Sequence, residues 1–266
     1  MTTLAVVGAG VMGETLISGL IRAGWDPGQI TAADRHPARL AEIGTRHGIS
    51  IADTEPAVAG ADAVVIVVKP QDVAEVLPQV ASALRPGALV VSLCAGVSTG
   101  RLEAALPNGT PVVRVMPNTP AQVDEGMAAI SAGSSATAAN LEFVTSLLSA
   151  VGKVVTVPEK YQDAVTAISG SGPAYLFFVV EAMIDAGVML GLPRDIATTL
   201  VVQTMYGSAK LLADSGEHPT VLRERVTSPG GTTAAALREL EANRVKAAFI
   251  TAMEAARDRS RELAGS

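Results

Sequence analysis

Residues 4–13 are Leu4-Ala5-Val6-Val7-Gly8-Ala9-Gly10-Val11-Met12-Gly13, and this stretch decides how the first half of the 266-residue chain folds. Its four leading apolar residues, two of them β-branched, are typical of a buried parallel strand, and residues 14–21 continue with helical spacing. The glycines stand in the G-x-G-x-x-G spacing. We expect Gly8 to allow the tight turn, Gly10 to admit a pyrophosphate against the backbone and Gly13 to let the helix approach the strand.

This turn predicts a dinucleotide site. The free N–H groups and the positive dipole end of the following helix attract phosphates. Asp34 stands 21 residues beyond Gly13, the separation at which an acid reaches the adenosine ribose. The alternative is a strand-to-helix turn with a purely structural role, in a chain that holds 25 glycines.

The composition describes a globular, acidic protein. Hydrophobic residues make up 48% of the chain and charged residues 17%, which excludes a disordered chain, and the length allows one large or two ordinary domains. The net charge of −6 argues against a nucleic acid or an anionic membrane as partner. The one cysteine, Cys94, excludes an internal disulfide and fits a reducing cytosol. We interpret it as a small buried residue, with a reactive thiol as the alternative.

We expect a cytoplasmic protein without a metal or a membrane span. Polar and acidic residues interrupt the N-terminal stretch directly after the glycine turn, so no signal peptide is predicted. The most apolar run, Ala174 to Val180, stops at Glu181 and is far too short for a span. The three histidines, at positions 36, 47 and 218, lack metal-ligand spacing.

Strand and helix patterns alternate through the first half, which predicts a doubly wound parallel sheet in an α/β fold. The expected strands are 4–7, 30–33, 48–51, 63–68, 88–93, 112–115, 126–130 and 154–157. The expected helices between them are 37–44, 73–84, 99–106 and 138–151, the last with Thr137 as its N-cap.

Beyond Pro158 only helical patterns remain. Helices are expected from Pro173 to Leu190, from Pro193 to about Asp214, over 219–226, and twice more after the break at Ser228-Pro229-Gly230-Gly231. We therefore predict a dinucleotide-binding domain over 1–158 and an all-helical domain over 159–266.

The helix from Pro173 to Leu190 is apolar almost all the way round, with Glu181 and Asp185 as its only charges. Such a helix must be buried on most sides, and a domain of roughly a hundred residues has trouble enclosing it alone. We expect it to be buried between two subunits. A central helix within one subunit is the alternative.

Charged residues at strand ends are candidates for cofactor contacts, because ligands bind at the carboxyl edge of such sheets. An acid such as Asp34 binds the ribose 2′-hydroxyl of NAD, whereas an arginine such as Arg35 accommodates the 2′-phosphate of NADP, so the pair leaves the cofactor open. For Arg35 the alternatives are stacking on the adenine and a solvated surface position. Lys69, followed by Pro70, is expected to approach the cofactor, with a solvent-facing loop as the alternative.

Two further loops are expected at the same edge. Cys94-Ala95-Gly96 has side chains small enough to admit a flat nicotinamide ring. The loop Met116-Pro117-Asn118-Thr119-Pro120 is stiffened by two prolines. The amide of Asn118 can bond either to a carboxamide or to neighbouring loops.

Two glycine-rich turns in the helical half are candidate anion sites, because each is expected to open a helix. Ser169-Gly170-Ser171-Gly172-Pro173 offers two hydroxyls and free N–H groups, with a simple capped helix start as the alternative. Thr227-Ser228-Pro229-Gly230-Gly231-Thr232-Thr233 has denser hydroxyls and is expected to contact a ligand. We find no histidine in a glycine-rich loop of this half to protonate an alkoxide, which favours C=N over C=O reduction.

Together these motifs resemble the Δ1-pyrroline-5-carboxylate reductase family. The resemblance rests on residues 8–13, 68–70, 116–120, 167–175 and 227–233, in the family's order and spacing over nearly the whole chain. It implies NAD(P)H-dependent reduction of 1-pyrroline-5-carboxylate to L-proline, the last step of proline biosynthesis, in the cytoplasm. It also implies a Rossmann-type domain followed by an all-α dimerisation domain, with homodimers formed through the C-terminal helices and often assembled into decamers.

The resemblance assigns roles to residues of this chain. Cofactor contacts are implied at Gly8, Ala9, Gly10, Val11, Met12, Gly13, Asp34, Arg35, Thr54, Val67, Val68, Lys69, Pro70, Cys94, Ala95 and Gly96, to which the residue pattern adds Asn118. Substrate contacts are implied at Thr232 and Thr233, and the glycine-rich turns add Ser171, Ser228, Gly230 and Gly231. Arg225 stands where animal members often have asparagine, which leaves its cofactor role open.

We therefore expect NADPH, with NADH as the alternative, to lie across the strand ends. The substrate carboxylate is expected on the N–H groups of residues 230–233 and the Thr233 hydroxyl on the ring nitrogen, which makes Thr233 the catalytic candidate. One rival is another two-domain dehydrogenase, such as one for β-hydroxyacids, whose long helix would carry a lysine that residues 175–190 lack. The other rival is a dinucleotide-binding regulator, which need not keep the hydroxyl-rich turn.

Overall fold

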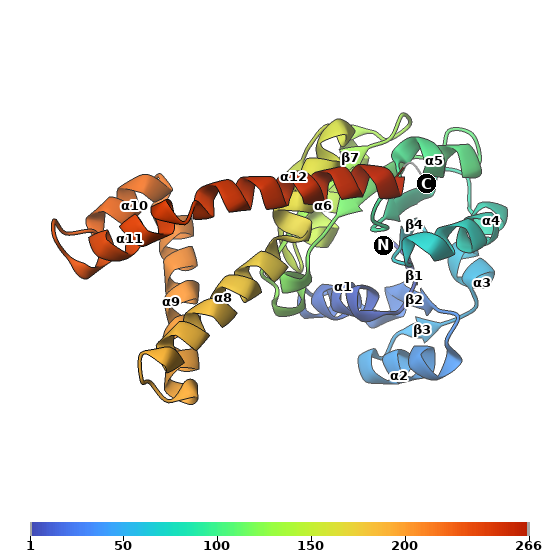
Figure 1. The fold of residues 1–266 in the computed structure, drawn as a ribbon. Coiled ribbons are helices and arrows are strands. Elements are labelled where there is room, and N and C mark those ends of the chain that lie inside the picture. The colour runs from blue at the N-terminus through green and yellow to red at the C-terminus, as the bar shows by residue number, and fades with distance from the viewer. Residues whose placement is uncertain (1, 265–266) are drawn as a thin grey trace. The chain divides into compact units, whose positions relative to one another are not determined.

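The computed structural model describes residues 2–264 and divides into two compact units (Figure 1). The first unit holds the residues up to Ser171 together with those from Ala256 onward, and the second holds Gly172–Ala255. The predicted functional division into 1–158 and 159–266 stays a prediction. The contacts themselves divide the chain at 171/172 and return the end of the last helix to the first unit.

The elements follow the order strand, helix, strand through the first unit. They are β1 (Leu4–Val7), α1 (Val11–Arg22), η1 (Pro27–Gln29), β2 (Ile30–Ala33), α2 (Pro37–His47), β3 (Ser50–Ile51), α3 (Thr54–Ala59), β4 (Ala63–Ile66), η2 (Pro70–Asp72), α4 (Val73–Ala83), β5 (Leu89–Ser92), α5 (Thr99–Ala105), β6 (Val112–Met116), η3 (Thr119–Val123), β7 (Gly126–Ala132), α6 (Ala138–Leu148), β8 (Gly152–Thr156), η4 (Glu159–Tyr161), α7 (Gln162–Val165) and the π-helical turn η5 (Thr166–Gly170). The remaining helices are α8 (Gly172–Met189), α9 (Arg194–Ser215), α10 (Pro219–Arg225), α11 (Thr232–Ala242) and α12 (Val245–Ala264).

Within residues 2–264 the eight strands form one sheet in the order β3-β2-β1-β4-β5-β6-β7-β8, in which only the β6–β7 pair is antiparallel. The predicted doubly wound α/β sheet is therefore confirmed. In the strand register Val7 pairs with both Ala33 and Ile66, and Ile66 pairs with Ser92. The carboxyl ends of β2, β1, β4 and β5 therefore lie together at one edge of the sheet. The strand order reverses beside β1, which opens a crevice for a ligand at that edge.

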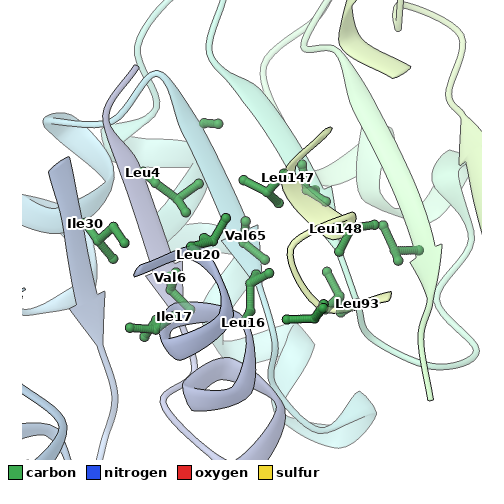
Figure 2. Packing of buried hydrophobic residues seen from close by; sticks show 14 of the residues in the cluster. Leu4, Val6, Leu16, Ile17, Leu20, Ile30, Val65, Leu93, Leu147 and Leu148 are labelled. Carbon is green, nitrogen blue, oxygen red and sulfur yellow. The ribbon is translucent and has the colours of Figure 1, made fainter. Parts of the chain in front are cut away.

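Helices cover both faces of the sheet, which explains the continuous apolar strands. Leu4 and Val6 of β1 belong to the core on one face, under α1, α2 and α6, and Val7 belongs to the core under α3, α4 and α5. Figure 2 shows Leu16 of α1 and Leu148 of α6 among the side chains of the first of these cores. Since fully burying one such side chain contributes about 1.5–3 kcal/mol, this packing fixes α1, and with it the glycine turn, against the sheet.

In the second unit α8 packs on α9 while much of its apolar surface is exposed within the single chain. A Cβ on Gly187 would lie 3.0 Å from the Cβ of Ala197, so the two helices approach closely there. Phe177 and Phe178 are 68% and 72% exposed. By length and composition, one helical run among the described residues, Glu159–Met189, would suffice to cross a membrane, although the sequence predicts no span.

The helix predicted from Pro173 to Leu190 is present as α8, which begins one residue earlier, at Gly172. The helical backbone that α7 and the π-turn η5 place before it was not predicted, because a loop was expected there. The six-residue helix α3 was also not predicted, because it is short and contains Pro56. The other predicted elements are present with shifted ends, and Thr137 forms the expected cap, reinforced by Asn140.

Candidate functional site

The glycine turn has the geometry that its spacing predicts. Gly8 lies at φ +107°, and a Cβ there would lie 2.4 Å from the carbonyl oxygen of Val67. A Cβ on Gly13 would lie 2.0 Å from the carbonyl oxygen of Gly8. By contrast, a Cβ on Gly10 would meet nothing within 4 Å. Gly8 and Gly13 therefore serve the turn and the helix contact, and Gly10 keeps open the approach that a pyrophosphate needs.

Helix α1 presents backbone donors to this approach. Gly10 is its N-cap and has no side chain to bond the first N–H groups, and the first helical bond runs from the Glu14 N–H to the Gly10 carbonyl. The N–H groups of residues 11–13 therefore lack helical partners. They suit a diphosphate, which is the group the turn predicts.

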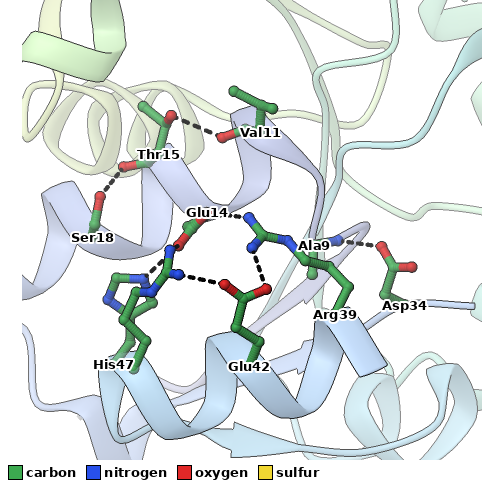
Figure 3. Close-up of polar contacts among 10 residues, drawn as sticks. Ala9, Val11, Glu14, Thr15, Ser18, Asp34, Arg39, Glu42 and His47 are labelled. Atoms are coloured by element: carbon green, nitrogen blue, oxygen red, sulfur yellow. Dashed lines mark hydrogen bonds and ion pairs between the residues drawn. The ribbon is translucent and has the colours of Figure 1, made fainter. Parts of the chain in front are cut away.

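Asp34 is bound to the turn itself. Its carboxylate accepts the Ala9 N–H at 2.7 Å (Figure 3). It also accepts the His36 N–H at 2.9 Å. Partial burial would raise the pKa of Asp34, but these hydrogen bonds outweigh it and lower the pKa. The charge was predicted to serve a ribose hydroxyl. In the structure it holds the glycine turn and the β2–α2 corner together, and its ribose contact stays a prediction.

A charged cluster that the sequence did not predict joins α1 to α2. Glu14 accepts hydrogen bonds from Arg39, from Arg46 at 2.6 Å and from His47 at 3.1 Å, and Arg39 also bonds Glu42 (Figure 3). Burial acts to raise the pKa of Glu14, while these donors lower it overall. The signal was the spacing of the three bases, which places them on one face of α2. Because Arg39 lies in the first turn of α2 and Arg46 and His47 in its last, the cluster holds α2 to α1 along its length.

The strand ends enclose a cleft of about 390 Å³. Eight predicted cofactor residues line it: Gly8, Gly10, Asp34, Arg35, Thr54, Val67, Val68 and Lys69. The prediction missed other lining residues, among them His36, Asp53, Asp72, Glu75 and Gln79. Arg35 donates to Asp72 at 3.0 Å and is well exposed, so its guanidinium stands at the cleft with donors to spare.

A second cavity, of about 700 Å³, borders the loop after β5. Pro70, Ala95, Gly96 and Ser171, four predicted site residues, line it, together with Gln71, Ala74, Val97, Arg101, Thr166, Ala256, Arg259, Ser260 and Leu263. The wall from α12 is held by Ser260, which donates to Asp163 at 2.8 Å. Cys94 is buried, and burial raises the pKa of its thiol, so the interpretation as a small buried residue holds.

Asn118 bonds to neighbouring loops, one of its two predicted uses. Its Oδ1 accepts the Met127 N–H at 2.8 Å, and its Nδ2 donates to the Ser169 carbonyl at 3.1 Å. A direct cofactor contact by this residue stays a prediction. Ser171 is not at a helix start with free donors, because its N–H bonds the Thr166 carbonyl at 2.8 Å.

The hydroxyl-rich turn does open a helix. Gly231 is the N-cap of α11, and Gly230 has φ +70°, so the chain reverses directly before Thr232 and Thr233. The first N–H groups of α11 therefore lack helical partners. Arg225 directs both terminal nitrogens to the Glu217 carboxylate, so its guanidinium holds the loop before α10.

The switch-point crevice, the open glycine turn and the uncapped start of α1 define a dinucleotide-binding α/β protein, and the family model that matches this part of the chain adds the oxidoreductase class. Residues 3–96 match a family model described as NADP oxidoreductase, coenzyme F420-dependent. Residues 159–263 match the pyrroline-5-carboxylate reductase dimerisation model.

Relatives are similar over the whole chain. A pyrroline-5-carboxylate reductase of Corynebacterium melassecola is 46% identical, covering 99% of each chain. The solved structure of one from Coxiella burnetii has a TM-score of 0.94 at 34% identity, covering 98% of each chain. That of Plasmodium falciparum pyrroline carboxylate reductase with NADP bound has a TM-score of 0.89 at 30% identity, covering 99% of this chain and 98% of that one. The chain belongs to the pyrroline-5-carboxylate reductase family.

Proposed function

We propose that this chain reduces 1-pyrroline-5-carboxylate to L-proline, with hydride transfer to the C=N carbon. The observation that carries the proposal is the 46% identity over 99% of the chain to a reductase of that name. The open nucleotide turn supports it independently, because hydride transfer from NAD(P)H needs a site for the dinucleotide.

The residues present fit a nicotinamide dinucleotide. The N–H groups at the start of α1 would hold its diphosphate, and the 390 Å³ cleft would hold its adenosine half. The loop at Ala95 and Gly96 would hold the nicotinamide, as the side chains there are small. When bound, the cofactor supplies the hydride.

NADPH is the proposed cofactor, with NADH as the alternative. The Asp34 carboxylate, which would repel a 2′-phosphate, is already bonded to two backbone N–H groups. Arg35 and Lys69 add positive charge at the same cleft. Asp53, Asp72 and Glu75 also line it, so the preference depends on the local placement of Arg35.

Thr233 is the proposed catalytic residue, and Thr232 and the glycine-rich turn the proposed carboxylate site. The N–H groups at the start of α11 would bind the substrate carboxylate, and Ser228, Gly230 and Gly231 shape that turn. The half-buried Thr233 hydroxyl would accept the N–H of the protonated ring and orient its carbon. Such catalysis consists of positioning and electrostatics.

The chain is proposed to form a cytoplasmic homodimer through its C-terminal helices, with decamers as the further assembly. The dimerisation model matches 159–263, and the exposed phenylalanines of α8 lie within that range. A second copy therefore accounts for the apolar surface of Glu159–Met189 without a membrane.

The reaction is tested by following absorbance at 340 nm in two assays: NADPH oxidation with pyrroline carboxylate, and NADP⁺ reduction with β-hydroxyacid substrates. Turnover with pyrroline carboxylate alone supports the proposal. Turnover with a β-hydroxyacid supports the other dehydrogenase class, and NADPH binding without any turnover supports a regulator.

The role of Thr233 is tested by Thr233→Val, which keeps the shape and removes the hydroxyl. As a substrate contact it should cost roughly 1.5–3 kcal/mol in kcat/KM, about ten- to a hundredfold, with NADPH affinity unchanged. If the residue only stabilises the helix start, the variant should lose about 1 kcal/mol of stability and keep normal kinetics. Thr220→Val, at the start of α10, is the matched control.

A further inference from the structure

The π-turn at Thr166–Gly170 compensates for a proline inside a helical run. In a regular helix the Ser169 carbonyl would accept from the N–H of residue 173, but Pro173 has none. The backbone widens here, and the Ser171 N–H bonds the Thr166 carbonyl, five residues back. The Ser169 carbonyl is thereby left for a donor from elsewhere.

Asn118 supplies that donor. Its Nδ2 lies 3.1 Å from the Ser169 carbonyl oxygen, and its Oδ1 is fixed by the Met127 N–H at 2.8 Å. Because the amide is held on both sides, its orientation is determined by the start of β7. The side chain thus ties the π-turn to the rigid edge of the sheet.

A second contact, between Met116 and Gly170, restrains the same turn. A Cβ on Gly170 would lie 2.4 Å from the Cε of Met116, so the end of β6 approaches the turn where there is no side chain. Residues 116 and 118 therefore hold adjacent points of the turn, one by packing and the other by a hydrogen bond.

The turn carries side chains of the larger cavity. Thr166 is the first residue of the turn and Ser171 directly follows it, and both line the 700 Å³ cavity together with Ala95 and Gly96. The Thr166 hydroxyl donates to the Gln162 carbonyl at 2.9 Å, which leaves its oxygen lone pairs as acceptors. The placement of both hydroxyls beside the β5 loop thus depends on the conformation of the π-turn.

We infer that Asn118 is a positioning residue for hydride transfer: it holds the π-turn so that Thr166 and Ser171 keep their places in the cavity beside the Ala95–Gly96 loop. The inference rests on the proposed function. It replaces a direct contact between Asn118 and the cofactor with an action through the turn. A misplacement of about 1 Å in such a site costs roughly a hundredfold in rate.

The experiment separates two roles of Asn118: positioning the cavity residues for catalysis, and stabilising the fold by giving the Ser169 carbonyl a hydrogen-bond donor. Asn118→Ala leaves the Ser169 carbonyl without a donor, and Pro173→Ala restores a backbone N–H that can satisfy it in regular helical register. Wild type, both single variants and the double variant are compared by melting temperature, by NADPH affinity from fluorescence, and by kcat and KM. We expect Asn118→Ala to lower kcat about ten- to a hundredfold with NADPH affinity within twofold. The double variant should regain melting temperature but not kcat.

Asn118→Asp tests the inference even if Asn118→Ala misfolds. It keeps the acceptor for Met127 and loses the donor, except when the new carboxyl is protonated. Its activity relative to wild type should rise as the pH falls, whereas Asn140→Asp, in the α6 cap, should follow wild type. Normal kcat in Asn118→Ala, or kcat recovered together with melting temperature in the double variant, overturns the inference. A flat relative pH profile for Asn118→Asp does so as well. Wild type without turnover on pyrroline carboxylate overturns the proposed function instead.

Discussion

Two alanine substitutions in one turn should have opposite effects. In Gly13→Ala the new Cβ would lie 2.0 Å from the Gly8 carbonyl oxygen, whereas Cβ atoms essentially never approach closer than 3.0 Å. The gap must widen by at least 1.0 Å, and the obstacle is backbone held at φ +107°. Helix α1 must therefore shift away from the core that Leu16 and Leu20 share with the sheet.

The expected cost follows from this forced shift. Overpacking of a core costs about 1–3 kcal/mol, and an immovable backbone atom places Gly13→Ala at the upper end. A loss of about 3 kcal/mol lowers the melting temperature of a chain of this size by roughly 6–12 °C. In Gly10→Ala the new Cβ meets nothing within 4 Å and φ is −69°, but Gly10 is the N-cap of α1, where alanine is less favourable than glycine. This loss opposes the gain from a less flexible unfolded chain, so the stability should stay within about 1 kcal/mol of wild type.

The affinity for NADPH, in contrast to stability, should fall more in Gly10→Ala than in Gly13→Ala. The methyl group that Gly10→Ala adds stands where the backbone must approach the diphosphate. We therefore expect the Kd for NADPH to rise at least tenfold in this variant, which corresponds to about 1.4 kcal/mol. Thermal melts with and without NADPH, and a fluorescence titration, measure both quantities. Gly60→Ala is the control, because Gly60 lies at the opposite edge of the sheet and a Cβ there would be 3.9 Å from its nearest neighbours, an ordinary van der Waals distance. A Gly13→Ala protein that melts with wild type, or a Gly10→Ala protein that melts far below it, would refute the reasoning.

Three further predictions concern charge and assembly. Glu159 accepts from Thr99 at 2.5 and 2.7 Å and from the buried Arg114 at 3.1 Å, so Glu159→Gln should cost about 2–3 kcal/mol at pH 7, measured by denaturant unfolding. Burial acts to raise the pKa of Glu159, but its hydrogen-bond donors lower the pKa overall. The contribution of the Glu159 charge to the free energy of unfolding is therefore complete above the unfolded carboxyl pKa of about 4.3 and is lost as the pH falls through the lower folded pKa. A stability difference between wild type and Glu159→Gln that persists in acid would contradict this. Arg35→Ala should weaken NADPH about tenfold more than NADH in titrations, and equal losses would remove Arg35 from the 2′-phosphate site. Sedimentation at micromolar concentration should show no wild-type monomer, and Phe178→Glu should yield one; a stable, active wild-type monomer would end the dimer proposal.

The sheet and the glycine turn could be predicted because their signals are local. Strands buried on both faces are continuous apolar runs, and the spacing of Gly8, Gly10 and Gly13 marks the sharp turn that the structure contains. The end of each strand then places its loop at the ligand edge, which is why most predicted cofactor residues line the two cavities.

The polar contacts that hold the site could not be predicted, because they join residues far apart in sequence. The Asp34–Ala9 bond spans 25 residues, the Asn118–Ser169 bond 51 and the Thr99–Glu159 bonds 60. Proline at 173 was a sound local signal for a helix start. It located the start of α8 to within one residue but did not reveal the helical backbone before it, where a donor from another loop bonds the Ser169 carbonyl that Pro173 leaves without an N–H.

The return of α12 to the first unit makes that unit discontinuous along the chain, which matters during synthesis. The 84 residues of Gly172–Ala255 are translated before the segment that carries Ser260. At about 5–20 residues per second this takes roughly 4–17 s, during which Asp163 has no Ser260 to accept from. The first unit therefore acquires the wall that carries Ser260 only after the whole second unit has been translated, and until then its earlier segment lacks that wall.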